Sequence, residues 1–363
     1  MTPQDLPSLT SMRFFAALMV ALFHACVWSS VPLGPFRYGF VGVTFFYILS
    51  GFVLTWTWRP HDSLRFFYLR RFARVYPLHL LTAMIALAFA ALGVRGEGEV
   101  SPLTALLNLA LLQAWVPDLA VVGALNGPSW SLSNEAFFYA VFPLLVGLLL
   151  SARLGPAIGV LGALGWLVVG GLVTVRFFPN LDWFLYVSPL YRLGEFAVGV
   201  GLALAVQRGT RIPVPLWAAV MAAGSGYLAL WFANRLTGGF VDEHQGACHL
   251  VVLPGFALLI VSAAARDATG ARGVLHHRWL VRLGQWSFAL YLVHVLLLRV
   301  AQPAFSALRG DFRALLALAV VAGAILVSAV LYEWFERPIE KRIRAWGHQR
   351  ESMLARSVDR VAR

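Results

Sequence analysis

Long apolar stretches separated by short polar connections dominate this sequence. The first stretch, residues 9–31, is long enough to cross a bilayer as a helix, because about 20 apolar residues suffice. Further stretches share this pattern, and we expect them at residues 40–58, 76–94, 130–150, 156–176, 188–206, 213–233, 249–265, 283–301 and 313–335. The pattern predicts an all-α integral membrane protein with about ten transmembrane helices.

One apolar run, residues 103–115, is too short to span, and runs of this length are often re-entrant or interfacial. Without it, an even number of spans puts both termini on one side. That side then carries the loop 59–75, with its five arginines, and the basic C-terminal segment. Basic loops face the cytoplasm, so we expect both termini there and the protein in a bacterial inner membrane. Counting 103–115 as a full span would instead place the basic tail outside.

The composition agrees with this class of protein. Of the 363 residues, 60% are hydrophobic and only 13% are charged, unlike a soluble domain. The net charge of +12 arises from the loops and the tail, so it does not indicate a nucleic-acid partner. We expect one transmembrane domain, residues 1–340, and a basic cytoplasmic tail, residues 341–363, lying on the lipid surface. The two cysteines, Cys26 and Cys248, have no disulfide or metal-binding pattern, and we expect no metal.

The first stretch carries two ionisable residues, Arg13 and His24. Eleven positions apart on a helix, they share one face and lie about 16 Å apart along the axis. Ionisable groups in a spanning helix usually face the bundle interior or a wet cavity. The alternatives are that Arg13 is an anchor at the membrane edge and that His24 is a packed, hydrogen-bonded histidine.

Other ionisable residues fall at a similar depth in later stretches, in the half of the membrane away from the termini. They are Glu135, Arg192, Glu195 and His294. We expect Arg192, Glu195 and His294 to line a substrate pocket there. Arg192 and Glu195 are three positions apart and could instead form a plain ion pair on one helix. His294 could be a structural hydrogen-bonding residue.

A lone buried carboxylate needs a partner, and His24 is the natural candidate for Glu135. A histidine oriented by a carboxylate is a general-base arrangement that can activate a hydroxyl. Near the opposite surface, Arg70, Arg71 and Arg74 offer planar donors suited to phosphates, unless they are only the usual positive charge of a cytoplasmic loop. Together these features indicate a phosphate-bearing donor on the inside and an acceptor hydroxyl within the membrane.

Seven motifs follow one another along the chain: Arg13-x10-His24, FFYILSGFVL, RRFARVYP, PSWSLSNEAFFY, YRLGEFAVG, GQWSFALYLVH and YEWFERPIEK. In this order and spacing, over nearly the whole chain, they resemble the acyltransferase-3 family of integral-membrane O-acyltransferases. The chain departs from the family pattern at Thr10-Ser11, where many relatives have Asp-Gly, at Asn134, where Val is common, and at Phe288, where Tyr is common.

The resemblance implies cytoplasmic acyl-CoA, usually acetyl-CoA, as donor and co-substrate, and hydroxyls of glycans or secondary metabolites as acceptors. It also implies that His24 is the catalytic base, that Glu135 belongs to the active site, and that Arg13, Arg71 and Arg74 lie along the acyl-CoA path.

We therefore predict a membrane O-acyltransferase that transfers an acyl group from acyl-CoA to a sugar hydroxyl of a surface or exported polysaccharide, free or lipid-linked. Acylation of a small glycosylated secondary metabolite is an alternative for the same chemistry. The rival class is a proton-coupled transporter that uses His24, Glu135 and His294 as a relay, although no inverted repeat is evident.

Overall fold

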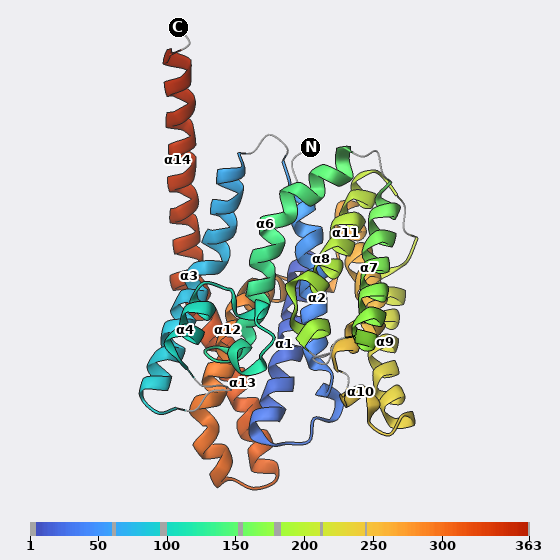
Figure 1. Cartoon of the computed structure of the whole chain (residues 1–363), viewed down its shortest axis with the longest axis vertical. Helices are drawn as coiled ribbons and strands as arrows, with labels where there is room; N and C mark the ends of the chain where they lie inside the picture. Colours follow the sequence, from blue (N-terminus) through green and yellow to red (C-terminus); the bar gives the residue numbers. More distant parts are fainter. Residues whose placement is uncertain are drawn as a thin grey trace.

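The computed structural model describes residues 5–59, 63–94, 100–151, 155–177, 183–210, 213–243 and 245–361. Every regular element in these ranges is helical, and ten helical segments are long and apolar enough to cross a membrane. They form one bundle (Figure 1). Within this part of the chain, the prediction of an all-α membrane protein with about ten spanning helices is confirmed.

The long helices are α1 Pro7–Ser29, α2 Gly42–Trp56, α3 Leu64–Ala91, α6 Trp130–Ser151, α7 Pro156–Phe177, α8 Pro189–Gln207, α9 Leu216–Leu236, α11 Cys248–Ala268, α12 Arg278–Ala307, α13 Asp311–Leu331 and α14 Arg337–Val361. The short helices are α4 Pro102–Leu109, α5 Leu119–Val122 and α10 Phe240–Glu243. The remaining turns are η1 Gly34–Phe36, η2 Gly39–Val41, η3 Gln113–Trp115, η4 Gly127–Ser129, η5 Trp183–Val187, η6 Gln245–Ala247, η7 Val274–His276 and η8 Tyr332–Glu336, of which η5 and η8 are π-helical.

The two ends of the bundle are distinguished by the chain termini. α1 begins at the end from which α14 projects, so both described ends of the chain lie at the same end of the molecule (Figure 1). We call this end the terminal face and the opposite end, where α1 finishes and α2 begins, the distal face. The prediction that the termini share one side is confirmed, whereas their cytoplasmic location stays a prediction.

Glycines let α2 and α8 touch backbone to backbone. A Cβ on Gly51 would lie 2.0 Å from the carbonyl oxygen of Phe196, and one on Gly199 would lie 2.0 Å from the carbonyl oxygen of Ile48. Such distances exclude any larger residue at either position. Small residues commonly allow this close approach in membranes. The contact fixes the register of the two helices and therefore the position of the polar side chains that they carry.

α3 begins earlier than the sequence pattern indicated, at Leu64 rather than near residue 76. Ser63 caps it, because its side chain accepts a hydrogen bond from the Phe66 N–H at 3.2 Å. Four of the five arginines that we expected in a loop are therefore part of the helix, and only Arg59 precedes it. Arg70 and Arg71 precede Arg74 by four and three positions, so both share a helix face with it.

The basic tail differs from the prediction, because it stands upright instead of lying across the surface. α13 continues through the π-helical turn η8 into α14, which packs along the first turns of α3 and projects beyond the terminal face (Figure 1). Glu336 and Glu340 pair with Arg74 of α3, and the ring of Phe66 contacts that of His348, with centroids 4.2 Å apart. Residues 362–363 of the predicted tail lie outside the described part of the chain.

The short run at residues 103–115 was predicted not to span the membrane, and it forms no spanning helix. α4 starts with a capping box between Ser101 and Thr104, and the chain then turns at Leu111, whose φ is 57°. The Asn108 side chain donates to the Val121 carbonyl at 3.1 Å, and His79 of α3 contacts the Asn108 carbonyl at 3.0 Å. These bonds fold the segment back against α3.

An ion pair secures the loops of the distal face. Nε of Arg37, in the loop after α1, donates to Oδ1 of Asp242 in α10 at 2.8 Å. Nδ2 of Asn234 donates to the other carboxylate oxygen, also at 2.8 Å. Hydrogen bonding from Arg37 lowers the pKa of Asp242, so the pair stabilises the fold at neutral pH and is lost as the pH falls through that lowered pKa.

Candidate active site

A cavity of about 680 Å³ opens at the terminal face between α2, α3, α6, α12 and α14. Its volume is typical of small-molecule sites. Arginines dominate its charged lining, with fewer acidic residues. The arginines are Arg13, Arg59, Arg70, Arg71, Arg74 and Arg344, and the acidic residues are Asp5, Glu135 and Glu340. The cavity therefore suits an anionic ligand.

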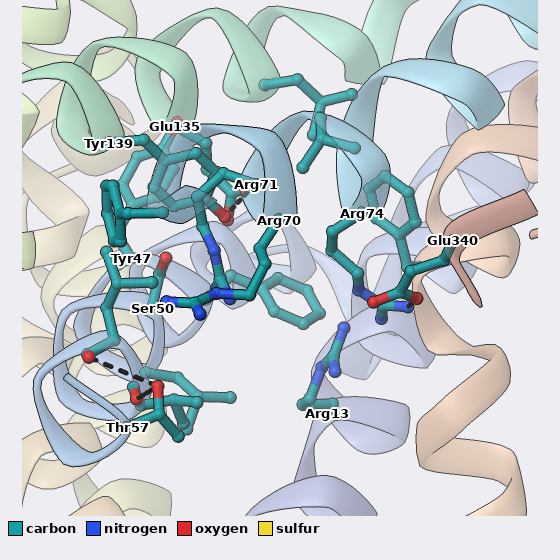
Figure 2. A pocket seen from close by; sticks show the side chains of 18 of the residues that line it. Arg13, Tyr47, Ser50, Thr57, Arg70, Arg71, Arg74, Glu135, Tyr139 and Glu340 are labelled. Atoms are coloured by element: carbon teal, nitrogen blue, oxygen red, sulfur yellow. Dashed lines mark hydrogen bonds and ion pairs between the residues drawn. The ribbon is translucent and has the colours of Figure 1, made fainter. Parts of the chain in front are cut away.

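Two of these arginines form no hydrogen bond to any other described residue. The guanidinium of Arg71 lies over the Tyr139 ring, 6.0 Å from its centroid, and its buried Nε has no partner. Arg13 extends from α1 into the same space (Figure 2). Even a partly buried guanidinium is costly without a partner, and planar N–H groups of this kind bind phosphates and carboxylates well. The placement of Arg13 in the cavity also contradicts its interpretation as an anchor at the membrane edge.

Arg74 is held differently, although it lies only one turn from Arg71. It forms ion pairs with Glu336 and, at 3.5 Å, with Glu340. Glu340 also pairs with Arg344. The two arginines predicted to bind phosphate therefore differ in their surroundings. Arg71 is open to the cavity, whereas Arg74 links α3 to the turn η8 and to α14 through its ion pairs.

Glu135 lies in the cavity, and its partner is not the expected one. Its carboxylate accepts a hydrogen bond from the hydroxyl of Tyr139 at 3.2 Å, and it lies within electrostatic range of Arg13, Arg71 and Arg74. No hydrogen bond joins Glu135 to His24, so the expected pairing of the two is wrong. A tyrosine four positions along the helix and three arginines from other helices balance the carboxylate instead.

His24 contacts a second histidine. Its Nδ1 lies 3.1 Å from Nε2 of His294 on α12. His24 is outside the lining of the cavity, but the two regions are adjacent. Tyr291 lines the inner end of the cavity, and its ring centroid is 6.1 Å from that of His294. Phe46 also lines that end and packs against Tyr291 with centroids 5.8 Å apart. The Tyr291 ring thus links the cavity to the histidine pair.

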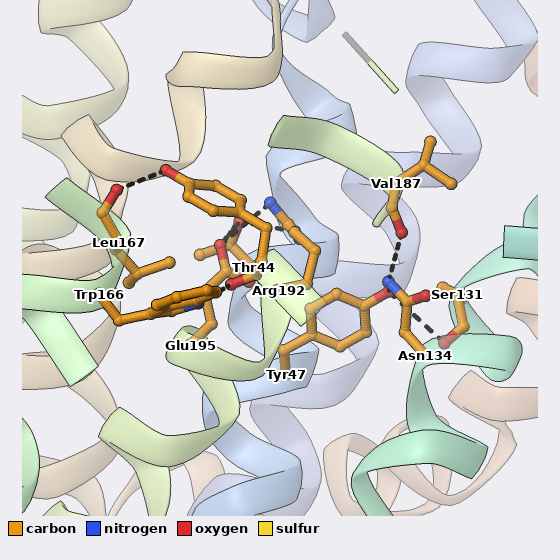
Figure 3. Close-up of polar contacts among 10 residues, drawn as sticks. Thr44, Tyr47, Ser131, Asn134, Trp166, Leu167, Val187, Arg192 and Glu195 are labelled. Atoms are coloured by element: carbon orange, nitrogen blue, oxygen red, sulfur yellow. Dashed lines mark hydrogen bonds and ion pairs between the residues drawn. The ribbon is translucent and has the colours of Figure 1, made fainter. Parts of the chain in front are cut away.

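Arg192 and Glu195 lie elsewhere, fully buried between α8 and α2. Their side chains form an ion pair at 3.0 Å, and Thr44 hydrogen-bonds to both at 3.3 Å (Figure 3). The ion-pair alternative for these two residues is confirmed. Neither they nor His294 line the arginine-rich cavity, so their assignment to a separate substrate pocket stays a prediction.

Comparison with known proteins identifies the class of enzyme. The family model described as the acyltransferase domain of type 3 matches residues 6–333. The chain belongs to the acyltransferase-3 family. The prediction of an integral-membrane O-acyltransferase is therefore confirmed.

Individual relatives of this acyltransferase span most of the chain. It is 34% identical over 367 residues to the acyltransferase MdmB of Streptomyces mycarofaciens, covering 92% of this chain and 91% of that protein. It is 27% identical over 312 residues to the exopolysaccharide production protein ExoZ of Rhizobium meliloti, covering 85% and 92%. It is 21% identical over 363 residues to the peptidoglycan O-acetyltransferase OatA of Listeria monocytogenes, covering 92% of this chain but only 56% of that protein. No solved structure matches it significantly.

Several residues of this acyltransferase's cavity were missed by sequence reasoning. Tyr139 follows Glu135 by four positions, so helical spacing alone could have found it. Tyr291 sits one turn before His294 and was equally accessible to that argument. Arg344 and His348 could not be found in this way, because only the upright packing of α14 against α3 brings them to the mouth. In the described ranges, no three His, Cys, Asp or Glu side chains are grouped as a metal site.

Proposed function

We propose that this acyltransferase binds acyl-CoA, with acetyl-CoA as the first candidate, in the arginine-lined cavity. It would transfer the acyl group to a carbohydrate hydroxyl that approaches His24 from the distal side. The observation that carries this proposal is the pair of partly buried arginines, Arg13 and Arg71, that face the cavity without a hydrogen-bonding partner among the described residues. The mouth of the same cavity carries Arg59 and Arg344, which suit the phosphates of coenzyme A.

The position of the cavity supports a donor that enters from the cytoplasm. Coenzyme A carries its phosphates at one end and the thioester at the other, and phosphates do not cross a bilayer. The cavity is lined by arginines and also by Phe46 and Tyr291, and the Tyr291 ring lies next to that of His294. We infer that the pantetheine arm passes Arg13 toward these rings and that the terminal face is cytoplasmic, as its basic loops also favour.

The chemistry needs one base. A nitrogen of His24 takes the proton of the acceptor hydroxyl, and the oxygen attacks the thioester carbonyl carbon. The carbon–sulfur bond then breaks, and the leaving thiolate takes a proton from the imidazolium. The products are the O-acyl ester and free coenzyme A, and His24 returns to its starting state. Arg13 and Arg71 hold the donor and do not take part in the bond changes.

The names of two relatives support a glycan acceptor, since they refer to exopolysaccharide and to peptidoglycan. We propose a sugar hydroxyl of an exported polysaccharide. A small glycosylated metabolite would need the same chemistry, and the name of MdmB, the relative with 34% identity, states no acceptor.

Glycan analysis of a strain that lacks this gene tests the proposal. The O-acetyl content of its extracellular polysaccharide, measured by proton NMR, should fall and should return when the wild-type gene is supplied. His24→Ala should not restore it, although the protein reaches the membrane at the normal level, whereas His277→Ala, a change at the start of α12, should restore it. Unchanged polysaccharide in the deletion strain would refute the acceptor, and restoration by His24→Ala would refute the base.

The sidedness has its own test. Thr237 and Thr269 are matched exposed residues, each hydrogen-bonded to its own helix end, at the distal and terminal faces respectively. In a background of Cys26→Ala and Cys248→Ala, Thr237→Cys should react with a membrane-impermeant thiol reagent added to intact cells. Thr269→Cys should react only after permeabilisation. The reverse pattern would contradict a donor that enters from the cytoplasm.

A further inference from the structure

The hydrogen bonds around the histidine pair fix which ring nitrogens carry protons. Nδ1 of His294 lies 3.0 Å from the carbonyl oxygen of Leu290, one turn earlier on α12. Nδ1 of His24 lies 3.0 Å from the carbonyl oxygen of Val20, one turn earlier on α1. A carbonyl oxygen is only an acceptor, so each Nδ1 must be the protonated nitrogen of its ring.

This assignment determines the contact between the two rings. Because Nδ1 of His294 carries the proton, its Nε2 offers a lone pair, and that lone pair faces the N–H at Nδ1 of His24 at 3.1 Å. The opposite assignment would place a lone pair of each Nδ1 against a carbonyl oxygen, which is repulsive at 3.0 Å. The N–H of His24 is therefore shared between Val20 and His294, and Nε2 of His24 is left unprotonated.

We propose that His294 is a positioning residue that holds His24 as a base with a free Nε2. The proposal rests on the proposed function, because it assigns a role within the same acyl transfer. Nε2 of His24 takes the proton of the acceptor hydroxyl. The resulting imidazolium is stabilised at Nδ1 by the lone pair of His294, until Nε2 gives a proton to the departing thiolate. A neutral histidine thus takes the part that a carboxylate plays in other histidine bases, and no proton passes to His294.

The position of the pair is consistent with this role. His294 is fully buried, whereas His24 is only partly buried, so one ring is fixed by packing and the other can meet a substrate. The Phe23 ring packs edge-on against the His24 ring, with centroids 5.2 Å apart, and limits its rotation. α1 and α12 are also held tightly together, because a Cβ on Gly284 would lie 1.8 Å from the carbonyl oxygen of Thr10.

Two substitutions at one position separate positioning from simple packing. His294→Leu removes the acceptor, whereas His294→Gln keeps an oxygen near the position of Nε2. With radiolabelled acetyl-CoA and polysaccharide from the deletion strain as substrates, His294→Leu should lower kcat by about 10²-fold and leave the KM for acetyl-CoA close to the wild-type value. His294→Gln should recover most of that loss. The matched control is His249→Leu, which removes another buried histidine, one that lies outside the histidine pair and the cavity lining, and should leave kcat unchanged.

A second readout does not depend on activity. In ¹⁵N-histidine NMR of the wild-type protein, assigned by difference from His24→Ala and His294→Leu, both rings should be in the Nδ1–H form, which is the minor tautomer of free histidine. An Nε2–H form of either ring, or equal kcat values for His294→Leu and wild type, would overturn the proposal. If the tautomers are as expected but the wild-type protein transfers no acyl group, the proposed function fails and the geometry stands.

Discussion

Two groups of buried charged side chains lie in this membrane domain, and they are built in opposite ways. The closed cluster consists of Arg192, Glu195 and Thr44, and its two charged side chains are completely inaccessible to solvent. The rings of Tyr47 and Tyr186 cover its guanidinium, with centroids 5.0 and 5.6 Å away. The open cluster consists of Arg13, Arg71 and Glu135, which come from three helices and face a cavity of about 680 Å³.

The difference lies in what balances the charge. In the closed cluster the two opposite charges form an ion pair at 3.0 Å within one turn of one helix, and this pair offsets part of the cost of burying them. Nε of Arg192 and Oε2 of Glu195 have no hydrogen-bond partner in the described part of the chain. In the open cluster, two guanidinium groups lack hydrogen bonds to other described residues, and an anionic ligand would supply them. Buried arginine is therefore not by itself a sign of a binding site. An arginine that faces a cavity and forms no ion pair with a described carboxylate, as Arg13 and Arg71 do, is one.

The largest expected effect is on stability, in the closed cluster. Arg192→Leu leaves Glu195 buried without its cation and should lower the free energy of unfolding by about 3–5 kcal/mol. The double variant Arg192→Leu/Glu195→Leu should recover most of this loss, because no charge then remains. Thermal unfolding in detergent, followed by tryptophan fluorescence, measures both. If the single variant were as stable as wild type, the cluster would not be a balanced pair.

In the open cluster the main effect should be on the donor. Arg71→Ala removes a charge-assisted contact worth about 1.5–3 kcal/mol, so the KM for acetyl-CoA should rise about ten- to a hundredfold while thermal stability is unchanged. Arg65→Ala, an exposed position on the same helix that does not line the cavity, is the matched control and should leave KM unaltered. A rise in the acceptor KM alone would mean that the cavity holds the acceptor and not the donor.

Arg74 shares features of both clusters, because it lines the cavity, like Arg71, but is paired with a carboxylate, Glu336, like Arg192. Its substitution should therefore affect both stability and donor binding. Arg74→Ala leaves that buried carboxylate without its partner and should lower the free energy of unfolding by about 1–3 kcal/mol. Its effect on the donor KM should be smaller than that of Arg71→Ala. Adding Glu336→Gln should restore stability. Equal kinetic effects of the two arginine changes, without a loss of stability, would show that both bind the donor directly.

The sequence was sufficient for the features that depend on local spacing. Apolar length predicted the spanning helices, and their even number, supported by the basic loops, predicted that the termini share one side. The three-residue spacing of Arg192 and Glu195 offered the ion pair, which we had kept as the alternative to a substrate pocket. It was insufficient where partners come from distant helices. The depth of Glu135 and His24 along their helices was comparable, but depth does not say which faces meet. Glu135 faces Tyr139 and the arginines, and His24 faces His294.

The smallest expected effect tests whether the closed cluster is only structural. Thr44→Val keeps the shape of the side chain but removes two long hydrogen bonds, at 3.3 Å each, and should cost about 1 kcal/mol. Thr55→Val is the matched control on the same helix. The Thr55 hydroxyl bonds at 2.8 Å to the carbonyl of Gly51, within its own helix, so its loss should change stability less. Both variants should retain normal KM values for donor and acceptor, because Thr44 and Thr55 lie outside the lining of the cavity. A selective rise in the acceptor KM of Thr44→Val would instead place Arg192 and Glu195 beside the acceptor, as the sequence first indicated, and the closed cluster would then have a part in recognition.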